Sequence, residues 1–166
     1  MNEPAKDDRD AFDREQPDLS PSFLDLYHES FAAMVRLVVL LTGSEHSAED
    51  LVHDSFIRVH ARWKHIEHPQ AYLRRTVVNA CRSAARRAKR ERATTLPFNG
   101  SASFEADEMF DVLGSLPHRQ RAALVLQFYE GLSQAEIAEV LGCREGTVAS
   151  LVHRGLAQLR RMVERE

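Results

Sequence analysis

The 166-residue sequence lacks any apolar run near the length of about 20 residues that a membrane-spanning helix requires. It has two cysteines, seven glycines and six prolines, and it contains no CxxC pair, HExxH motif or glycine-rich phosphate loop. Strand-like alternation of apolar and polar residues is also missing. These absences exclude a disulfide-stabilised fold and common zinc and nucleotide sites, and they favour an all-α protein. Because the opening residues, MNEPAKDDRDAFDRE, have no apolar core, we expect no secretion signal, no membrane contact and a cytoplasmic location.

Acidic and basic residues are segregated along the chain. The net charge of −3 alone does not suggest a nucleic-acid-binding protein. However, residues 1–20 hold seven acidic and three basic residues, a net charge of −4, and residues 71–92 hold eight basic residues and one acidic residue, a net charge of +7. A polyanion responds to the charge of the surface that it contacts rather than to the net charge of the whole protein. The basic segment therefore favours a nucleic-acid partner. We expect the acidic tail to be disordered and hypothesise that it shields the basic segment.

Over most of the chain, apolar residues recur three and four residues apart, which is the period of α-helices. Ser47 and Ser133 have the spacing of capping-box N-caps, and Pro69 suits a first helical position. The predicted helices cover about 19–41, 47–63, 69–91, 117–129, 133–141 and 144–166. Residues 93–105 have a loop composition. We therefore predict two small helical domains and a flexible linker, in the order disordered tail 1–18, first domain 19–92, linker 93–107 and second domain 108–166.

The stretch LSQAEIAEVLGCREGTVASLVHRGLAQLR, residues 132–160, predicts a helix-turn-helix. Ser133 and Glu136 form the expected capping box, and Gly142 supplies the left-handed residue that ends the first helix. On a helical wheel, the apolar sector of the second helix is expected to be core: Val148, Val152, Leu156, Leu159 and Val163. A recognition helix places its N-terminal half in the major groove. Candidate DNA-contacting residues are therefore Arg144, Thr147, Ser150, Leu151 and Arg154, with a merely solvated polar face as the alternative.

Residues 72–86 divide into two faces on the same wheel. One face is apolar: Leu73, Val77, Ala80, Cys81 and Ala84. The opposite face, which we name the arginine face, carries Tyr72, Arg75, Thr76, Asn79, Arg82, Ser83 and Arg86. Arginine suits phosphates and planar bases, and asparagine offers a donor and an acceptor to a base edge. No acidic residue on this face balances the arginines, which favours nucleic-acid binding over a simple solvated surface.

Two segments together resemble the extracytoplasmic-function sigma factors, the small two-domain specificity subunits of bacterial RNA polymerase. AEDLVHDSFIRVHARW followed by PQAYLRRTVVNACRSAARR resembles sigma region 2, and LPHRQRAALVLQFYEGLSQAEIAEVLGCREGTVASLVHRGLAQLR resembles sigma region 4. LLTGSEHSAEDLV is similar to an actinobacterial branch of the family. The resemblance covers about residues 19–163. It implies promoter recognition and transcription initiation with no catalytic group, metal or cofactor, because the polymerase performs the chemistry.

The resemblance implies three contact surfaces. Region 2 would dock on the clamp helices of the largest polymerase subunit through Asp50, His53, Asp54 and Arg58. It would also capture the −10 element through the connector 65–70 and the arginine face, with His65, Tyr72, Arg75, Asn79, Arg82 and Arg86 as candidates. Such a basic groove with flat side chains suits a single strand. Region 4 would dock on the polymerase flap and read the duplex −35 element. The implied partners are core polymerase and promoter DNA, and the existence of an anti-sigma factor stays open.

The sequence departs from the family pattern at three positions. His53 stands where family members commonly have glutamine, so we expect the contact with the polymerase clamp helices to differ from that of other members. Ala149 and Leu151 stand where many members have lysine or arginine. Because phosphate contacts supply much of DNA affinity, two missing cations predict weak −35 binding by the isolated C-terminal domain. Leu151 could still contact a thymine methyl group.

Alternative functions remain open at this point. A metalloenzyme would draw on His60, His65 and His68, but these residues straddle a helix end and a loop. A stand-alone helix-turn-helix regulator would bind a palindromic duplex as a dimer without polymerase. A sigma mimic that sequesters a partner would need only docking surfaces, so the arginine face argues against it. Trp63, at a helix end, either stacks on a base or belongs to the core.

Overall fold

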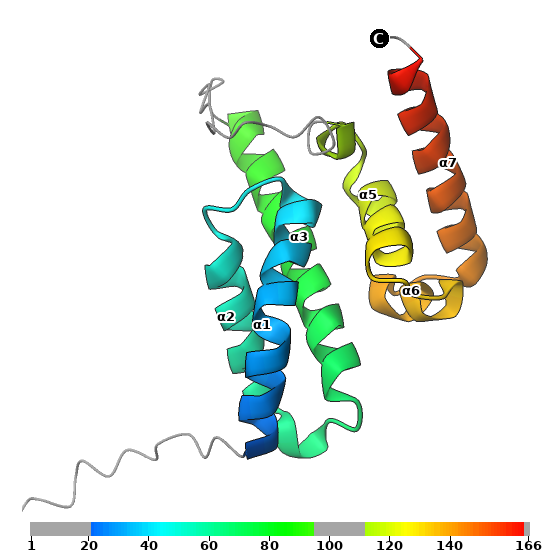
Figure 1. Ribbon diagram of the computed structural model, residues 1–166. Helices are drawn as coiled ribbons and strands as arrows, with labels where there is room; N and C mark the ends of the chain where they lie inside the picture. The colour runs from blue at the N-terminus through cyan, green and yellow to red at the C-terminus, as the bar shows by residue number, and fades with distance from the viewer. Residues whose placement is uncertain (1–20, 95–111, 165–166) are drawn as a thin grey trace, which may run out of the picture.

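The computed structural model describes residues 21–94 and 112–164, and within these ranges it contains helices and no strand (Figure 1). The predicted all-α fold class is confirmed. The predicted tail 1–18 and most of the predicted linker 93–107 lie outside the described residues. The elements are α1 (Pro21–Thr42), α2 (Ala48–Ala61), the 3₁₀ turn η2 (Trp63–His65), α3 (Pro69–Thr94), α5 (His118–Leu124), the π-helical segment η3 (Val125–Tyr129), α6 (Gln134–Leu141) and α7 (Glu145–Val163).

The helices α1, α2 and α3 pack against one another and form what we name the N-terminal unit (Figure 1). Each helix contributes one apolar stripe to the core, as the three- and four-residue spacing predicts. Pro69 begins α3, as expected. The predicted capping box at Ser47 is wrong, because its side chain makes no capping hydrogen bond. Glu49 and Asp50 still place negative charge in the first turn of α2, where it interacts favourably with the helix dipole and stabilises the helix.

Trp63 and Cys81 both belong to the N-terminal core. The Trp63 ring packs edge to face against Phe23, with ring centroids 5.2 Å apart, and it is half-buried. This placement favours the core role over base stacking. Cys81 is fully buried and is a free thiol, and its burial raises the pKa to about 12. The thiol therefore stays protonated and behaves as a small apolar side chain. Cys143 is also free and half-buried.

The segments α5, η3, α6 and α7 form the C-terminal unit (Figure 1). The predicted capping box at the start of α6 is present. The Glu136 backbone N–H donates to Ser133 Oγ at 3.2 Å, and the Ser133 backbone N–H donates to Glu136 Oε2 at 2.8 Å. Gly142 then ends α6 in the left-handed conformation, with φ of 61° and ψ of 46°. The sequence signals for the helix-turn-helix are thus confirmed by the backbone.

The buried stripe of α7 differs from the predicted one. Val148 and Val152 are buried as expected, but Leu156 is 41% exposed and Val163 is 67% exposed, so their assignment to the core was wrong. Leu151 and Gly155 lie in the stripe instead. The reason is a close helix approach: a Cβ placed on Gly155 would lie 2.8 Å from Leu124 Cδ1. Because α5 packs on Gly155, the side of α7 that contacts α5 includes Leu151, which the helical wheel placed at the edge of the polar face.

This approach predicts that Gly155→Leu destabilises the protein. Leu124 is buried and has little room to move, so the added side chain forces overpacking that costs about 1–3 kcal/mol. Leucine is a better helix former than glycine, so a loss of stability would reflect the clash alone. Urea unfolding measures the effect. Gly146→Ala, with nothing near its Cβ, is the control and should be neutral or stabilising. Equal or greater stability in Gly155→Leu would contradict the packing.

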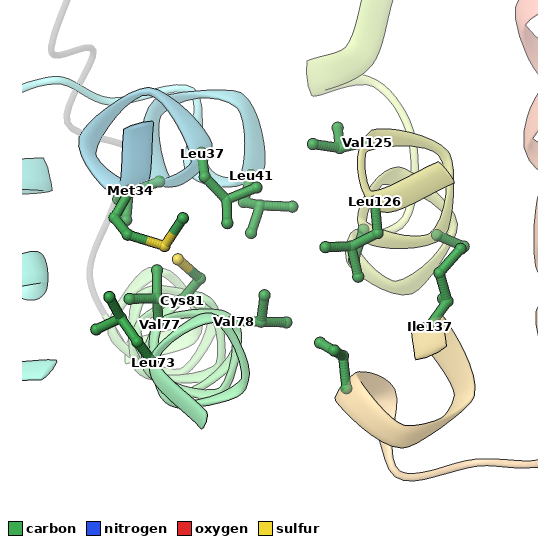
Figure 2. Close-up of a cluster of buried hydrophobic side chains, with 14 of the residues drawn as sticks. Met34, Leu37, Leu41, Leu73, Val77, Val78, Cys81, Val125, Leu126 and Ile137 are labelled. Atoms are coloured by element: carbon green, nitrogen blue, oxygen red, sulfur yellow. The ribbon is translucent and has the colours of Figure 1, made fainter. Parts of the chain in front are cut away.

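The two units share a continuous apolar core. Figure 2 shows Val77 and Cys81 of α3 pointing toward Met34 of α1, whereas Val78 points the other way, toward Leu126 of the C-terminal unit. Val78 and Leu126 both belong to the single buried cluster that spans the two units. The contact places the C-terminal unit against α3, which is the helix with the arginine face.

Candidate nucleic-acid interface

The arginine face of α3 is built by residues three and four apart on one helix. Arg75, Asn79 and Arg86 are exposed, and Tyr72 and Arg82 are half-buried. The Thr76 hydroxyl on this face donates to the Tyr72 carbonyl at 2.8 Å, so this hydroxyl is already engaged within the helix. His65 is exposed at the end of η2, in the connector that leads into α3. The helix therefore presents a line of cations with one aromatic ring and one amide.

The charge of this face is unbalanced locally. Among the described residues, no carboxylate forms a salt bridge with Arg75 or Arg86. Guanidinium groups that lack a carboxylate partner are available to phosphate oxygens, and they also stack on bases. Such a surface can hold the backbone of a single strand while flat side chains meet its bases.

A second surface lies on α2. Asp50, His53, Asp54 and Arg58 are all exposed, on adjacent turns of one helix face. The His53 Nε2 atom lies 2.9 Å from the Tyr27 hydroxyl, within hydrogen-bond distance, so α1 orients this imidazole. Ile57 stands on the same face and is 67% exposed, yet the sequence reasoning did not select it. Its position three residues after Asp54 and four after His53 was the available signal. Single exposed apolar side chains are common on protein surfaces, so Ile57 is a candidate contact residue because of the charged side chains beside it and not by its exposure alone.

The candidate reading residues of α7 have different surroundings. Arg144, at the N-cap, and Ser150 and Arg154 are exposed, and Thr147 is half-buried. Leu151 is only 7% exposed and packs in the core, so in this conformation its side chain does not meet a base. We therefore remove Leu151 from the candidate reading residues. The cause is the contact of α7 with α5, which turns this residue inward.

Within residues 21–94 and 112–164, no group of three or more His, Cys, Asp or Glu side chains is placed to hold a metal ion. None of the helices in these ranges has the length and apolarity needed to cross a bilayer.

A helical bundle with an arginine face and a helix-turn-helix with exposed polar side chains together indicate a DNA-binding protein. The chain matches the family Sigma-70 region 2 over residues 26–91 and the family Sigma-70 region 4 over residues 106–159. It belongs to the sigma-70 family of RNA polymerase sigma factors, in its extracytoplasmic-function group. Members of this family are initiation factors of transcription and not catalysts.

Relatives of known function support this assignment. The chain is 35% identical over 138 residues to the RNA polymerase sigma-E factor of Streptomyces coelicolor, covering 77% of this chain and 78% of that protein. It is 34% identical over 156 residues to the ECF RNA polymerase sigma factor SigE of Mycolicibacterium smegmatis, covering 84% of this chain and 61% of the relative. It is 31% identical over 151 residues to the sigma factor SigM of Mycobacterium tuberculosis, covering 86% of this chain and 77% of that protein.

Solved structures share the fold. The sigma factor RpoE of Bartonella quintana, in complex with the anti-sigma factor NepR, matches with a TM-score of 0.72 and 23% identity, covering 86% of this chain and 97% of that chain. CnrH, in complex with the cytosolic domain of CnrY, matches with a TM-score of 0.67 and 24% identity, covering 87% of this chain and 89% of that chain. These likenesses establish the arrangement of helices and nothing about partners of this chain.

Proposed function

We propose that this chain directs core RNA polymerase to promoters in the cytoplasm by contacting both DNA elements and the enzyme. The N-terminal unit docks on the clamp helices of the largest subunit through the exposed face of α2. The arginine face of α3 captures the −10 element as a melted strand. The C-terminal unit docks on the flap and reads the −35 duplex with Arg144, Thr147, Ser150 and Arg154. An anti-sigma factor is a further proposed partner.

The observation that carries this proposal is the separation of two unlike surfaces on one small helical unit. The α2 face is mixed in charge and has Ile57 at its centre, as suits a protein partner. The α3 face is cationic, as suits a phosphate backbone. Since different helices supply the two faces, one unit can hold the polymerase and the strand at the same time. A regulator acting without polymerase would have no use for the α2 face.

Run-off transcription with core polymerase, with and without this chain, on a library of genomic fragments tests the proposal. We expect initiation at a defined set of fragments only when the chain is present. Sizing chromatography of the mixture should show the chain migrating with the enzyme. The stand-alone regulator predicts the opposite result, namely a dimer that binds a palindromic duplex and gains nothing from polymerase. Separate migration with no gain of initiation on any template would reject the proposal.

We expect Ile57→Asp to weaken polymerase binding at least tenfold. An apolar side chain at the centre of a protein interface commonly contributes more than about 1.4 kcal/mol, which corresponds to a factor of ten. A buried carboxylate adds a desolvation cost. Val163→Asp is the matched control, because Val163 is equally exposed at 67% but lies at the end of α7. Equal polymerase affinity of the two variants would remove Ile57 from the docking surface.

A further inference from the structure

The arginine face of α3 is partly covered by the chain's own C-terminal unit. Val78 lies at the border of this face, three residues after Arg75 and four before Arg82, yet it is only 2% exposed. Figure 2 shows its side chain directed toward Leu126. An apolar residue between two arginines would be exposed on an isolated α3. Its burial shows that the C-terminal unit is packed against the border of the surface proposed for the DNA strand.

Polar contacts hold the two units together. Arg74 Nε donates to Glu130 Oε2 at 2.9 Å, and the two side chains are only 21% and 11% exposed. Arg121 Nη1 donates to the Leu41 carbonyl near the end of α1 at 3.0 Å. Partial burial weakens the screening of the ion pair by solvent, so it contributes more than an exposed pair would. Arg74 and Glu130 therefore form a latch between α3 and the C-terminal unit.

The surface that the C-terminal unit turns toward α3 carries further carboxylates. Glu136 and Glu139 of α6 line a cleft between the units together with Arg74 and Arg75. Hydrogen bonds from Ser133 lower the pKa of Glu136, and the nearby Arg74 charge lowers it further. Glu130, Glu136 and Glu139 thus form an acidic edge. Carboxylates and phosphates are both anionic oxygen acceptors that suit arginine.

The other end of the contact surface is also close to the arginine face. His118 and Arg119 of α5 line a small cavity with Val78, Asn79 and Arg82. Burial lowers the pKa of His118, and the charges of Arg121 and Arg82 lower it further. The C-terminal unit thus lies beside three of the candidate strand-binding positions, namely Arg75, Asn79 and Arg82.

We propose that in the free chain the C-terminal unit stays packed on α3, with the acidic edge against the arginine face, and we name this the closed state. We further propose that Arg74 binds a phosphate in the open state, in which the two units have separated. This inference rests on the proposed −10 role of α3. In the closed state, the Glu130 carboxylate takes the place on Arg74 that a phosphate takes in the open state. The C-terminal unit and the DNA strand then compete for one surface. A partner that binds more tightly when the two units are separated shifts the population toward the open state, and the shift is set by its difference in affinity for the two states.

Charge reversal of the latch tests the closure without reference to polymerase. Glu130→Arg places two arginines against each other and should open the chain, which small-angle X-ray scattering would detect as a larger radius of gyration. The double variant Arg74→Glu with Glu130→Arg restores an ion pair of reversed polarity and should close the chain again. Glu164→Arg adds the same charge at the exposed end of the chain, away from the latch, and should leave the radius unchanged. Circular dichroism confirms that each variant is folded.

The same proteins are then tested with a labelled single-stranded oligonucleotide by fluorescence anisotropy. If about a tenth of the free chain is open, full opening raises the apparent affinity roughly tenfold. Glu130→Arg should show this gain over Glu164→Arg, whereas the double variant should bind more weakly than the unmodified chain because Arg74 is lost. The same comparison in a chain lacking residues 1–18 separates shielding by the acidic tail from shielding by the latch.

Each outcome decides a different part of the proposal. An unchanged radius in Glu130→Arg would overturn the latch. A larger radius with no gain in strand binding over Glu164→Arg would overturn the occlusion of α3. Failure of the proposed function looks different: the radius still changes with the latch, but neither the unmodified chain nor the open variant supports initiation by core polymerase.

Discussion

We expect Arg82→Glu combined with Arg86→Glu to abolish promoter opening and to leave binding to core polymerase largely intact. The two reversals change the charge of the arginine face by four units, in the half nearer the C-terminal end of α3. A cationic groove then becomes one that repels the strand. Each phosphate contact adds about 0.9 to the slope of log affinity against log salt, so losing two contacts and adding two anions should lower transcription at least a hundredfold.

The structure explains why polymerase binding should survive this change. Asp50, His53 and Ile57 lie on α2, whereas the reversed residues lie on α3. Run-off transcription and permanganate footprinting of the melted strand measure opening, and co-migration on a sizing column measures docking. Arg160→Glu with Arg161→Glu, two exposed positions in the last turn of α7, applies the same charge change elsewhere. Unchanged transcription in the Arg82 and Arg86 variant would count decisively against the α3 assignment.

The second large effect concerns the −35 element. The full chain without polymerase should bind a −35 duplex no better than a scrambled duplex at physiological salt, with a dissociation constant in the non-specific range of about 10⁻⁴ to 10⁻⁶ M. Among the candidate reading residues, only Arg144 and Arg154 are cationic. Ala149, at a position where many family members have lysine or arginine, adds no charge. Too few phosphate contacts remain to hold the helix in the groove by itself.

Ala149→Arg tests this reasoning, because it restores a cation on the reading helix. We expect roughly tenfold tighter binding and a salt slope steeper by about 0.9, as one added phosphate contact predicts. Leu151→Arg is not an equivalent test, since Leu151 is buried and the substitution would place a charge in the core. Tight, sequence-selective binding by the unmodified chain in a gel-shift assay would refute the prediction.

The helix-turn-helix was predictable because its signals are local. A capping box needs only Ser133 and Glu136 at a fixed spacing, and Gly142 ends α6 because glycine adopts positive φ without steric cost. The helices α1 and α3 follow from apolar residues at helical spacing, which one segment of sequence contains in full. Ser47 shows the limit of such a signal, because the same pattern there is not accompanied by a capping bond.

Residues at helix contacts were harder to predict. Leu151 and Leu156 lie five positions apart on α7, and the wheel placed Leu156 in the core and Leu151 among the reading residues. The structure reverses both assignments, because Gly155 lets α5 approach along a different line. Ile57 was missed for a related reason, since exposure of a large apolar side chain depends on what its neighbours leave uncovered.

By itself, the sequence determined the helices, the turn between α6 and α7, and the gathering of cations on one face of α3, because each depends on residues within a few turns of one another. Only the tertiary structure decided that Val78 is buried, that Arg74 pairs with Glu130, and that Leu151 faces inward. These outcomes depend on contacts between segments distant in the chain. For Arg74 and Glu130 the separation is 56 residues, and no local pattern encodes which carboxylate an arginine will meet.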